Sequence, residues 1–203
     1  MKVLCIGRNY AAHARELGNA VPASPMFFLK PATAVVPLGP DFAIPRGRGA
    51  CHHETEITVR IGRRLQGEVS EQDVLAAIDG IGLGLDLTLR EVQDGLKQKG
   101  HPWEVAKAFD GAAPMGPFLD PAGFPDLQDI HFSLDVNGLR RQTGHSADMI
   151  TGIVAMIRQA VMIFTLEPGD VVMTGTPEGV AALQAGDVLT LTLGDQVWTT
   201  RVR

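Results

Sequence analysis

The run CHHETEITVRIG, residues 51–62, restricts the fold more than any other part of the chain. Apolar and polar residues alternate over residues 54–62, which is the pattern of a β-strand. Glu54 and Glu56 are two residues apart, so their side chains point to the same side of such a strand. Two neighbouring carboxylates repel each other unless a positive group lies between them. The run therefore predicts either a site for a hard divalent cation or a solvated edge strand with two surface acids.

Turn-forming residues are frequent, which favours a sheet-rich fold. The 203 residues include 23 Gly and 13 Pro, more than a strongly helical protein carries. Apolar residues make up 45% of the chain, so we expect one domain over residues 1–203 with an α+β, β-rich fold. Strands and hairpins are expected at residues 2–6 and 26–30, in GIGLGLDL ending at Asp86, at 130–143 around Asn137-Gly138, at 170–174, and in the C-terminal run turning near Gly194-Asp195.

Four helices are expected between these strands. They cover residues 10–17, 71–78, 89–98 and 147–164. Ser70 and Asp73 have the spacing of a capping box at the start of the second helix. Thr88 and Glu91 are expected to cap the third helix in the same way, and Gly100 to end it.

Composition argues against several classes of protein. The net charge is −5, and basic residues do not cluster beyond the short loop 46–48, so we expect no nucleic-acid partner. No apolar run reaches the roughly 18 residues that a membrane span requires, so we expect no membrane partner. The chain starts with the strand-like MKVLCIG rather than a leader, and Cys5 and Cys51 form no disulfide framework. A cytoplasmic location is therefore expected.

Asp86 is the third acid that bears on a metal site. It ends an otherwise apolar strand, where burial of a lone carboxylate is costly. Together with Glu54 and Glu56 it would give three oxygen ligands and leave positions open for water and substrate, as in catalytic Mg²⁺ sites. The alternative is that Asp86 caps the following helix.

Two further groups are candidates for chemistry. His13 and Glu16 are spaced i, i+3, so one helix face could present both, and a glutamate bound to one ring nitrogen makes the other more basic. The alternative is a surface pair without function. Lys107 has apolar neighbours that favour partial burial, and a buried lysine needs an anionic partner. Its alternative is a solvated position at a helix end.

Five separated segments together resemble one known family. They are IGRNYAAHARELG, HHETE, DLTLREVQ, KGHPWEVAKAFDG and MTGTPEGV, in this order. Their combination resembles the fumarylacetoacetate hydrolase superfamily, and most closely its short, single-domain members that act on acylpyruvates. The resemblance implies a fold like the C-terminal domain of that family, a mixed β-sheet roll with a few flanking helices. It also implies a homodimer.

The resemblance also implies roles for individual residues. Mg²⁺ or Mn²⁺ would be bound by Glu54, Glu56 and Asp86. The catalytic residues would be His13, Glu16 and Lys107. The substrate would be bound by Lys30, Arg90, Gln93 and Thr176. Spacing agrees for two of these, because Arg90 and Gln93 follow Asp86 by about one and two helical turns.

The expected activity is hydrolytic cleavage of a carbon–carbon bond in a 2,4-dioxo acid, giving pyruvate and a carboxylic acid. Alternatives within the same chemistry are an oxaloacetate decarboxylase and an isomerase or decarboxylase of 2-oxo-dienedioates in aromatic catabolism. A more distant alternative is a metal-stabilised binding protein without turnover. In each enzyme the partner would be a small 2-oxo or 2,4-dioxo acid.

Four further residues lie near these motifs. His145 and Ser146 stand where relatives often carry a small polar residue and a threonine, so their loop is expected to shape the pocket. At least one of His52 and His53 is expected to line or support the pocket rather than bind the metal, since imidazole would favour zinc.

Overall fold

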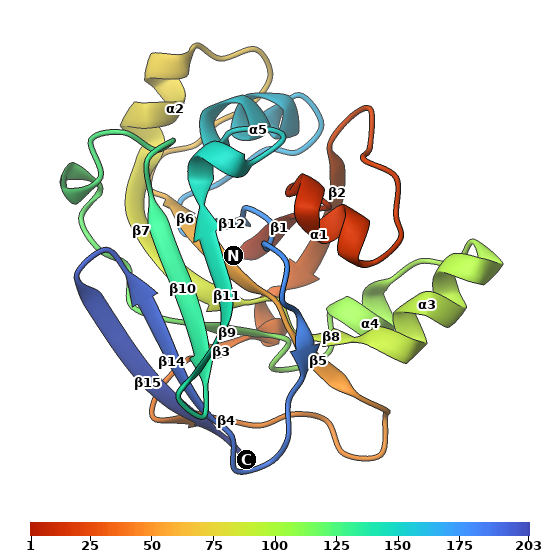
Figure 1. Ribbon diagram of the computed structural model, residues 1–203. Coiled ribbons are helices and arrows are strands. Elements are labelled where there is room, and N and C mark those ends of the chain that lie inside the picture. Colours follow the sequence, from red (N-terminus) through yellow and green to blue (C-terminus); the bar gives the residue numbers. More distant parts are fainter.

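The computed structural model describes residues 1–203 and contains three β-sheets flanked by short helices (Figure 1). The seven-stranded sheet has the spatial order β2 (Met26–Pro31), β1 (Lys2–Gly7), β12 (Val171–Met173), β6 (Thr55–Ile61), β7 (Ile78–Leu85), β9 (Ala113–Met115) and β3 (Val35–Pro37). The five-stranded sheet has the order β11 (Leu139–His145), β10 (His131–Val136), β14 (Val188–Leu193), β15 (Gln196–Val202) and β4 (Asp41–Phe42). A small sheet joins β13 (Ala181–Ala182), β5 (Cys51–His53) and β8 (Thr88–Leu89). These strands confirm the predicted β-rich α+β fold.

The helices are short and lie around the sheets (Figure 1). They are α1 (Ala11–Glu16), α2 (Glu71–Ala77), α3 (Arg90–Lys99), α4 (Glu104–Lys107) and α5 (Ile153–Val161). Helices α2 and α5 pack together at one end of the molecule, and α3 and α4 project from its side (Figure 1). No helix in the chain has both the length and the apolar character needed to cross a membrane.

The main core lies between the two larger sheets. Strand β10 contacts β6, and β14 contacts β7, so the sheets face each other. Ile57 and Leu83 from one sheet and Leu134 and Leu191 from the other belong to a single apolar cluster and are fully buried. Burial of each such side chain contributes about 1.5–3 kcal/mol. This packing fixes which face of β6 is left for polar residues.

Strand β6 lies in the middle of its sheet, so the solvated edge strand is excluded. It pairs antiparallel with β12 on one side and with β7 on the other. Both faces of the strand are buried, including the polar side chains of Glu56 and Thr58. In the same ladder, the backbone N–H of Asp86 donates to the Glu54 carbonyl at 2.8 Å. The register of β6 and β7 therefore brings three acidic residues to one end of the strand pair.

Two of the glycines in β7 are required by close packing. A Cβ atom on Gly82 would lie 2.8 Å from the Pro117 carbonyl oxygen, and one on Gly84 would lie 2.9 Å from Thr58 Cγ2. Because backbone and β-branched neighbours cannot move away cheaply, only glycine allows this approach.

Most predicted elements are confirmed. The hairpins turn at Asn137-Gly138, where both residues have positive φ, and at Gly194. The Ser70–Asp73 capping box is present, and Gly100 ends α3 in the left-handed conformation.

Two expectations about helices were wrong. The helix expected over 147–164 covers only Ile153–Val161, because the backbone N–H groups of Ile150 and Thr151 donate to Asn9 instead of continuing a helix, and Gly152 is the N-cap. Thr88 does not cap α3. It pairs with His52 in the small sheet, and its hydroxyl donates to the Asp86 carbonyl at 3.0 Å.

Candidate active site

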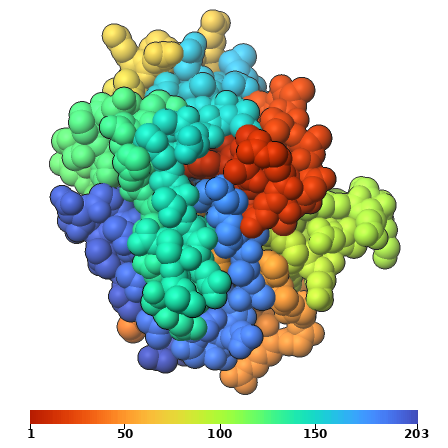
Figure 2. All heavy atoms as spheres, viewed as in Figure 1, coloured from red at the N-terminus to blue at the C-terminus, as the bar shows by residue number.

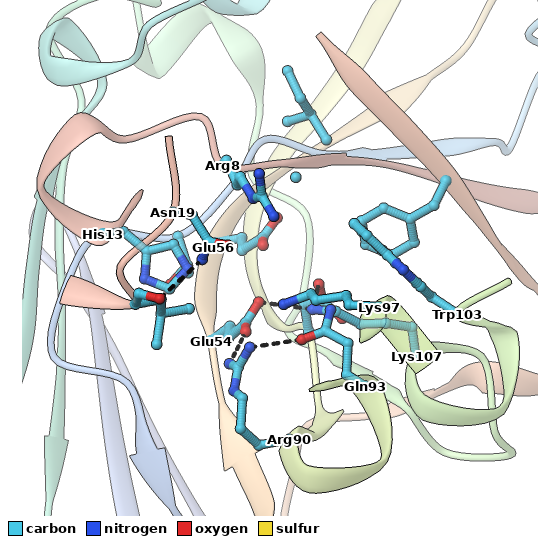
Figure 3. Close-up of a pocket in the computed structure, with 16 residues that line it drawn as sticks. Arg8, His13, Asn19, Glu54, Glu56, Arg90, Gln93, Lys97, Trp103 and Lys107 are labelled. Carbon is cyan, nitrogen blue, oxygen red and sulfur yellow. Dashed lines mark hydrogen bonds and ion pairs between the residues drawn. The ribbon is translucent and has the colours of Figure 1, made fainter. Parts of the chain in front are cut away.

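A pocket opens where the N-terminal segment faces α3 and α4 (Figures 2 and 3). Its polar wall contains Glu54, Glu56 and Asp86, which are 5%, 1% and 1% exposed. One oxygen of each carboxylate lies within 4.8 Å of the other two. Asp86 therefore belongs to the acidic cluster, and the N-cap of α3 is Leu89. The sequence-based alternative of Asp86 as a helix cap was wrong.

Three buried cations, Lys107, Arg90 and Lys30, form ion pairs with this cluster. Lys107 Nζ lies 2.8 Å from Glu54 Oε2 and 2.6 Å from Asp86 Oδ2. Arg90 pairs with the other Glu54 oxygen and donates to Gln93 Oε1 at 2.8 Å. Although burial opposes ionisation, Lys107 and Arg90 together lower the pKa of Glu54 below its ordinary value. Burial also lowers the pKa of Lys107, but Asp86 and Glu54 outweigh it and raise that pKa.

Lys30 does not line the pocket, contrary to its expected role in binding substrate. It is 0% exposed and lies behind Asp86, with Nζ 2.6 Å from Asp86 Oδ1. The same nitrogen donates to the backbone carbonyls of Lys107 and Ala112. Lys30 is therefore placed to hold Asp86 and the end of α4 in position rather than to touch a ligand.

Glu56 has fewer polar partners in the protein than Glu54 and Asp86 have. Its Oε2 accepts one hydrogen bond, from the backbone N–H of Gly175 at 2.7 Å, and it has no ion-pair partner. Burial and the charges of Asp86 and Glu54 raise its pKa well above the ordinary value. A hard divalent cation bound between the three carboxylates would remove this repulsion, so the donor set fits Mg²⁺ or Mn²⁺.

His13 and Glu16 both lie on α1, and His13 lines the pocket together with the acidic cluster (Figure 3). His13 is 5% exposed, and its Nδ1 is 3.4 Å from Glu16 Oε2. Burial lowers the pKa of His13, although Glu54 and Glu16 act in the opposite direction. The imidazole is thus neutral near pH 7, with Nδ1 directed at Glu16 and Nε2 left as an acceptor.

Thr176 lines the pocket, but its hydroxyl is bound to the protein. It donates to the Thr55 carbonyl at 2.9 Å and accepts from Gln142 Nε2 at 2.8 Å. The Oε1 of Gln142 lies 3.0 Å from His53 Nδ1. The hydroxyl proton of Thr176 therefore points away from a ligand, and His53 supports this loop from behind.

The loop of His145 and Ser146 does not shape the pocket, so that expectation was wrong. Ser146 is buried and accepts a hydrogen bond from the backbone N–H of Ile130. His145 pairs with Asp129 near the surface. Neither residue is among those that line the pocket.

Sequence reasoning missed several residues that line the pocket. They are Arg8, Asn19, Lys97 and Trp103 (Figure 3). Arg8 has a left-handed backbone with φ 59°, which is uncommon for a residue other than glycine. The only sequence feature that pointed to Arg8 was the turn GRNY, in which Arg8 directly follows the first strand.

Three comparisons with known proteins agree with this geometry. The family model described as "Fumarylacetoacetate (FAA) hydrolase C-terminal" matches residues 2–202. Oxaloacetate tautomerase YcgM of Escherichia coli (strain K12) is 50% identical over 99% of this chain and 92% of its own length. The mitochondrial oxaloacetate tautomerase FAHD1 of Bos taurus is 41% identical over 91% of this chain and 83% of its own length.

A solved structure supports the same assignment. The fumarylpyruvate hydrolase from Pseudomonas aeruginosa, in complex with Mn²⁺ and pyruvate, is 36% identical. It superposes with a TM-score of 0.93 over 100% of this chain and 89% of its own. The expected fold is therefore confirmed, and the chain belongs to the fumarylacetoacetate hydrolase family.

Proposed function

We propose that the protein is a divalent-metal-dependent enzyme that interconverts the keto and enol forms of oxaloacetate. The observation that carries the proposal is the neutral imidazole of His13 above a buried cluster of three carboxylates. A base of this kind suits removal of a weakly acidic carbon-bound proton. The two relatives named above, at 50% and 41% identity, are called oxaloacetate tautomerases.

Glu54, Glu56 and Asp86 would hold Mg²⁺ or Mn²⁺, as expected from the sequence. The bound ion would supply Lewis-acid polarisation of the 2-oxo group. Arg90 and Lys107 pair with Glu54, and Lys30 and Lys107 pair with Asp86, which holds these two carboxylates in position. The charged groups of the site are thus held in place before a ligand binds, and such preorganised charges are usually a large contribution to catalysis.

Charge favours a dicarboxylate substrate. The three cations Lys30, Arg90 and Lys107 balance the three carboxylates, so a divalent ion would leave the site with two surplus positive charges. Oxaloacetate carries two negative charges. Arg8 lines the pocket without an ion-pair partner and is placed to meet a carboxylate. Long-range attraction of this kind also speeds binding.

His13 performs the proton transfer in the proposed mechanism. Glu16 accepts a hydrogen bond from the Nδ1–H group of His13, so Nε2 is the free base. Nε2 takes one proton from C3 of the keto form, and the C3–H electron pair moves to form the C2–C3 double bond. The carbonyl electron pair moves to the C2 oxygen, which then accepts the proton from the imidazolium. Atoms balance without water, and His13 returns to its neutral form.

Hydrolysis of a 2,4-dioxo acid, the activity expected from the sequence, is the second candidate. It rests on the fumarylpyruvate hydrolase neighbour, which is less similar in sequence than the two tautomerases. The same dyad could take a proton from water instead of carbon. Decarboxylation of oxaloacetate would use the acidic cluster but requires no base.

One experiment separates these activities. Oxaloacetate in D₂O with Mg²⁺ is followed by NMR for deuterium at C3 and for pyruvate, beside samples with EDTA and with His13→Gln. We expect metal-dependent exchange that His13→Gln abolishes, with pyruvate at the uncatalysed rate. Faster pyruvate formation from oxaloacetate would indicate a decarboxylase. Pyruvate from fumarylpyruvate without C3 exchange would indicate the hydrolase.

The homodimer and the cytoplasmic location expected from the sequence stay predictions. Light scattering on the purified protein measures the first.

A further inference from the structure

A second group of converging metal-binding side chains lies outside the pocket, at the open end of the β10–β11 hairpin. Asp129, His131 and His145 each place one ligand atom within 4.8 Å of the others. Asp129 Oδ1 lies 2.9 Å from His145 Nε2 and 3.6 Å from His131 Nε2. Bonds of about 2.1 Å in a tetrahedral site place neighbouring ligand atoms about 3.4 Å apart. Both Asp129 distances lie near this value, so side-chain rotations would bring the three atoms around one ion.

The two histidines are held opposite each other by the strands. His131 begins β10, His145 ends β11, and they are direct partners in the antiparallel ladder. Their rings are stacked, with centroids 3.9 Å apart and planes inclined by 12°. Directly opposed residues project from the same face of a sheet. Both imidazoles therefore lie on one face of the hairpin, and rotation of the exposed His131 side chain would direct both Nε2 atoms to one ion without movement of the backbone.

The backbone around Asp129 is also fixed. Its N–H donates to the Asp126 carbonyl at 3.1 Å. The next residue, Ile130, donates to Ser146 Oγ at 2.8 Å, and the Ser146 N–H donates back to the Ile130 carbonyl at 3.0 Å. All three ligand residues thus belong to one hydrogen-bonded unit. Binding an ion requires only small rotations of exposed side chains, as a preorganised site should.

The chemistry of this group differs from that of the pocket. Two imidazoles and one carboxylate suit Zn²⁺ and similar ions, whereas three carboxylates suit Mg²⁺ or Mn²⁺. The side chains of Asp129 and His131 are each 69% exposed, so an ion can enter from solvent. We propose that Asp129, His131 and His145 form a second metal site, which binds Zn²⁺ or another borderline divalent ion with water as the fourth ligand.

The ion would hold one end of a segment that is hydrogen-bonded to the turn between β1 and α1. Residues 146–151 follow His145 directly, and their far end is bound to Asn9. The backbone N–H of Ile150 donates to the Asn9 carbonyl, and that of Thr151 donates to Asn9 Oδ1, both at 2.8 Å. Asn9 lies two residues before α1, which carries His13. The second metal site would therefore hold one end of a segment whose other end is bound to Asn9, just before α1.

The test is a Zn²⁺ titration of the full chain by calorimetry, in excess Mg²⁺ to fill the carboxylate site. The wild type is compared with His131→Gln, His145→Gln and the matched control His101→Gln, an exposed histidine without an ion-pair partner. We expect the wild type and the control to bind one more equivalent of Zn²⁺ than His131→Gln, with a Kd in the micromolar range or below. Zn²⁺ should also raise Tm by more in the wild type than in His131→Gln.

Two results would overturn the second metal site. One is an equal number of Zn²⁺ equivalents in the wild type and in His131→Gln. The other is no saturation of the wild type below about 1 mM, an affinity of only about 4 kcal/mol. His131 is largely exposed, so His131→Gln should fold even if His145→Gln does not, and circular dichroism checks this.

Discussion

Glu16 accepts a hydrogen bond from the backbone N–H of Gly179, with 3.0 Å between Oε1 and the nitrogen. Its other carboxylate oxygen faces His13 Nδ1. One side chain thus joins the helix that carries the proposed base to the loop that follows β12. The position of His13 above the carboxylates depends on this link as well as on the packing of α1.

Replacement of Gly179 by Ala should damage both the fold and this link. Gly179 has φ +94°, and a Cβ atom there would lie 1.9 Å from the Arg141 carbonyl oxygen. Strain and clash together should lower the free energy of unfolding by about 3 kcal/mol. Gly186→Ala is the matched control, since Gly186 has φ +97° but open space around it. Both free energies of unfolding are measured by urea denaturation. An equal decrease in the two variants would show that the clash with the Arg141 carbonyl does not contribute, which would contradict the prediction.

His13→Gln should lower the exchange rate at C3 by about 10²–10⁴-fold, the usual contribution of a general base. Mg²⁺ affinity should stay within about threefold of the wild type, because the proposed metal ligands are three carboxylates and do not include His13. Calorimetric titration measures the affinity, and NMR measures the exchange. Retention of the full exchange rate, or loss of Mg²⁺ binding, would remove His13 from the proposed role.

The pH dependence follows from the lowered pKa of His13. Burial keeps the imidazole neutral, so its pKa in the folded protein lies below the ordinary value of 6.5. The value of kcat/KM should therefore fall only as pH drops below about 6.5. The unfolded chain binds this proton more readily, so the same group costs stability as pH falls below 6.5. An acid limb above pH 6.5 in Mg²⁺ would contradict this assignment.

Glu56→Gln should have opposite effects on metal binding and on metal-free stability. The pKa of Glu56 is raised, so the wild type without metal loses stability as pH rises above 4.5, the ordinary value. Glutamine removes the repulsion, and the metal-free variant should have a higher Tm at pH 7. Mg²⁺ affinity should fall by more than the roughly 10–100-fold that loss of a supporting residue costs. Thermal unfolding with EDTA and with Mg²⁺ tests both effects, and a lower Tm in EDTA would contradict the prediction.

Arg8→Asn should weaken binding of a dicarboxylate specifically. Asparagine tolerates the left-handed backbone of Arg8, so the fold should persist. Loss of a charged hydrogen bond should lower kcat/KM for oxaloacetate by about 10–100-fold. Deuterium exchange into pyruvate, which has one carboxylate, should change by less than about threefold. Arg15→Asn on α1, outside the pocket lining, is the control, and equal losses for both substrates would exclude this role.

The sequence predicted the acidic cluster well because its physical signals are local. The alternation in 54–62 and the lone acid at the end of an apolar strand both follow from strand geometry, and the register of β6 and β7 brings them together. Thr88 and the 147–164 segment show the limit of such signals. Their backbone partners, His52 and Asn9, are distant in sequence, and tertiary hydrogen bonds decided the outcome.

Side-chain direction was harder to predict than residue identity. Lys30 belongs to the site but faces it from behind Asp86, and the hydroxyl of Thr176 points at the Thr55 carbonyl. Neither orientation has a signature in spacing or composition. The positive φ of Arg8 has none either, because arginine carries no preference for that conformation.

The balance between three buried carboxylates and three buried cations also bears on the life of the protein in the cell. Zinc fingers fold only when their ion is present, because nothing else neutralises or orders the ligands. Here Lys30, Arg90 and Lys107 pair with Glu54 and Asp86 within the folded chain, so two of the three acids have cationic partners without an ion. We therefore expect the chain to fold without a divalent ion and to stay folded when an ion is withdrawn.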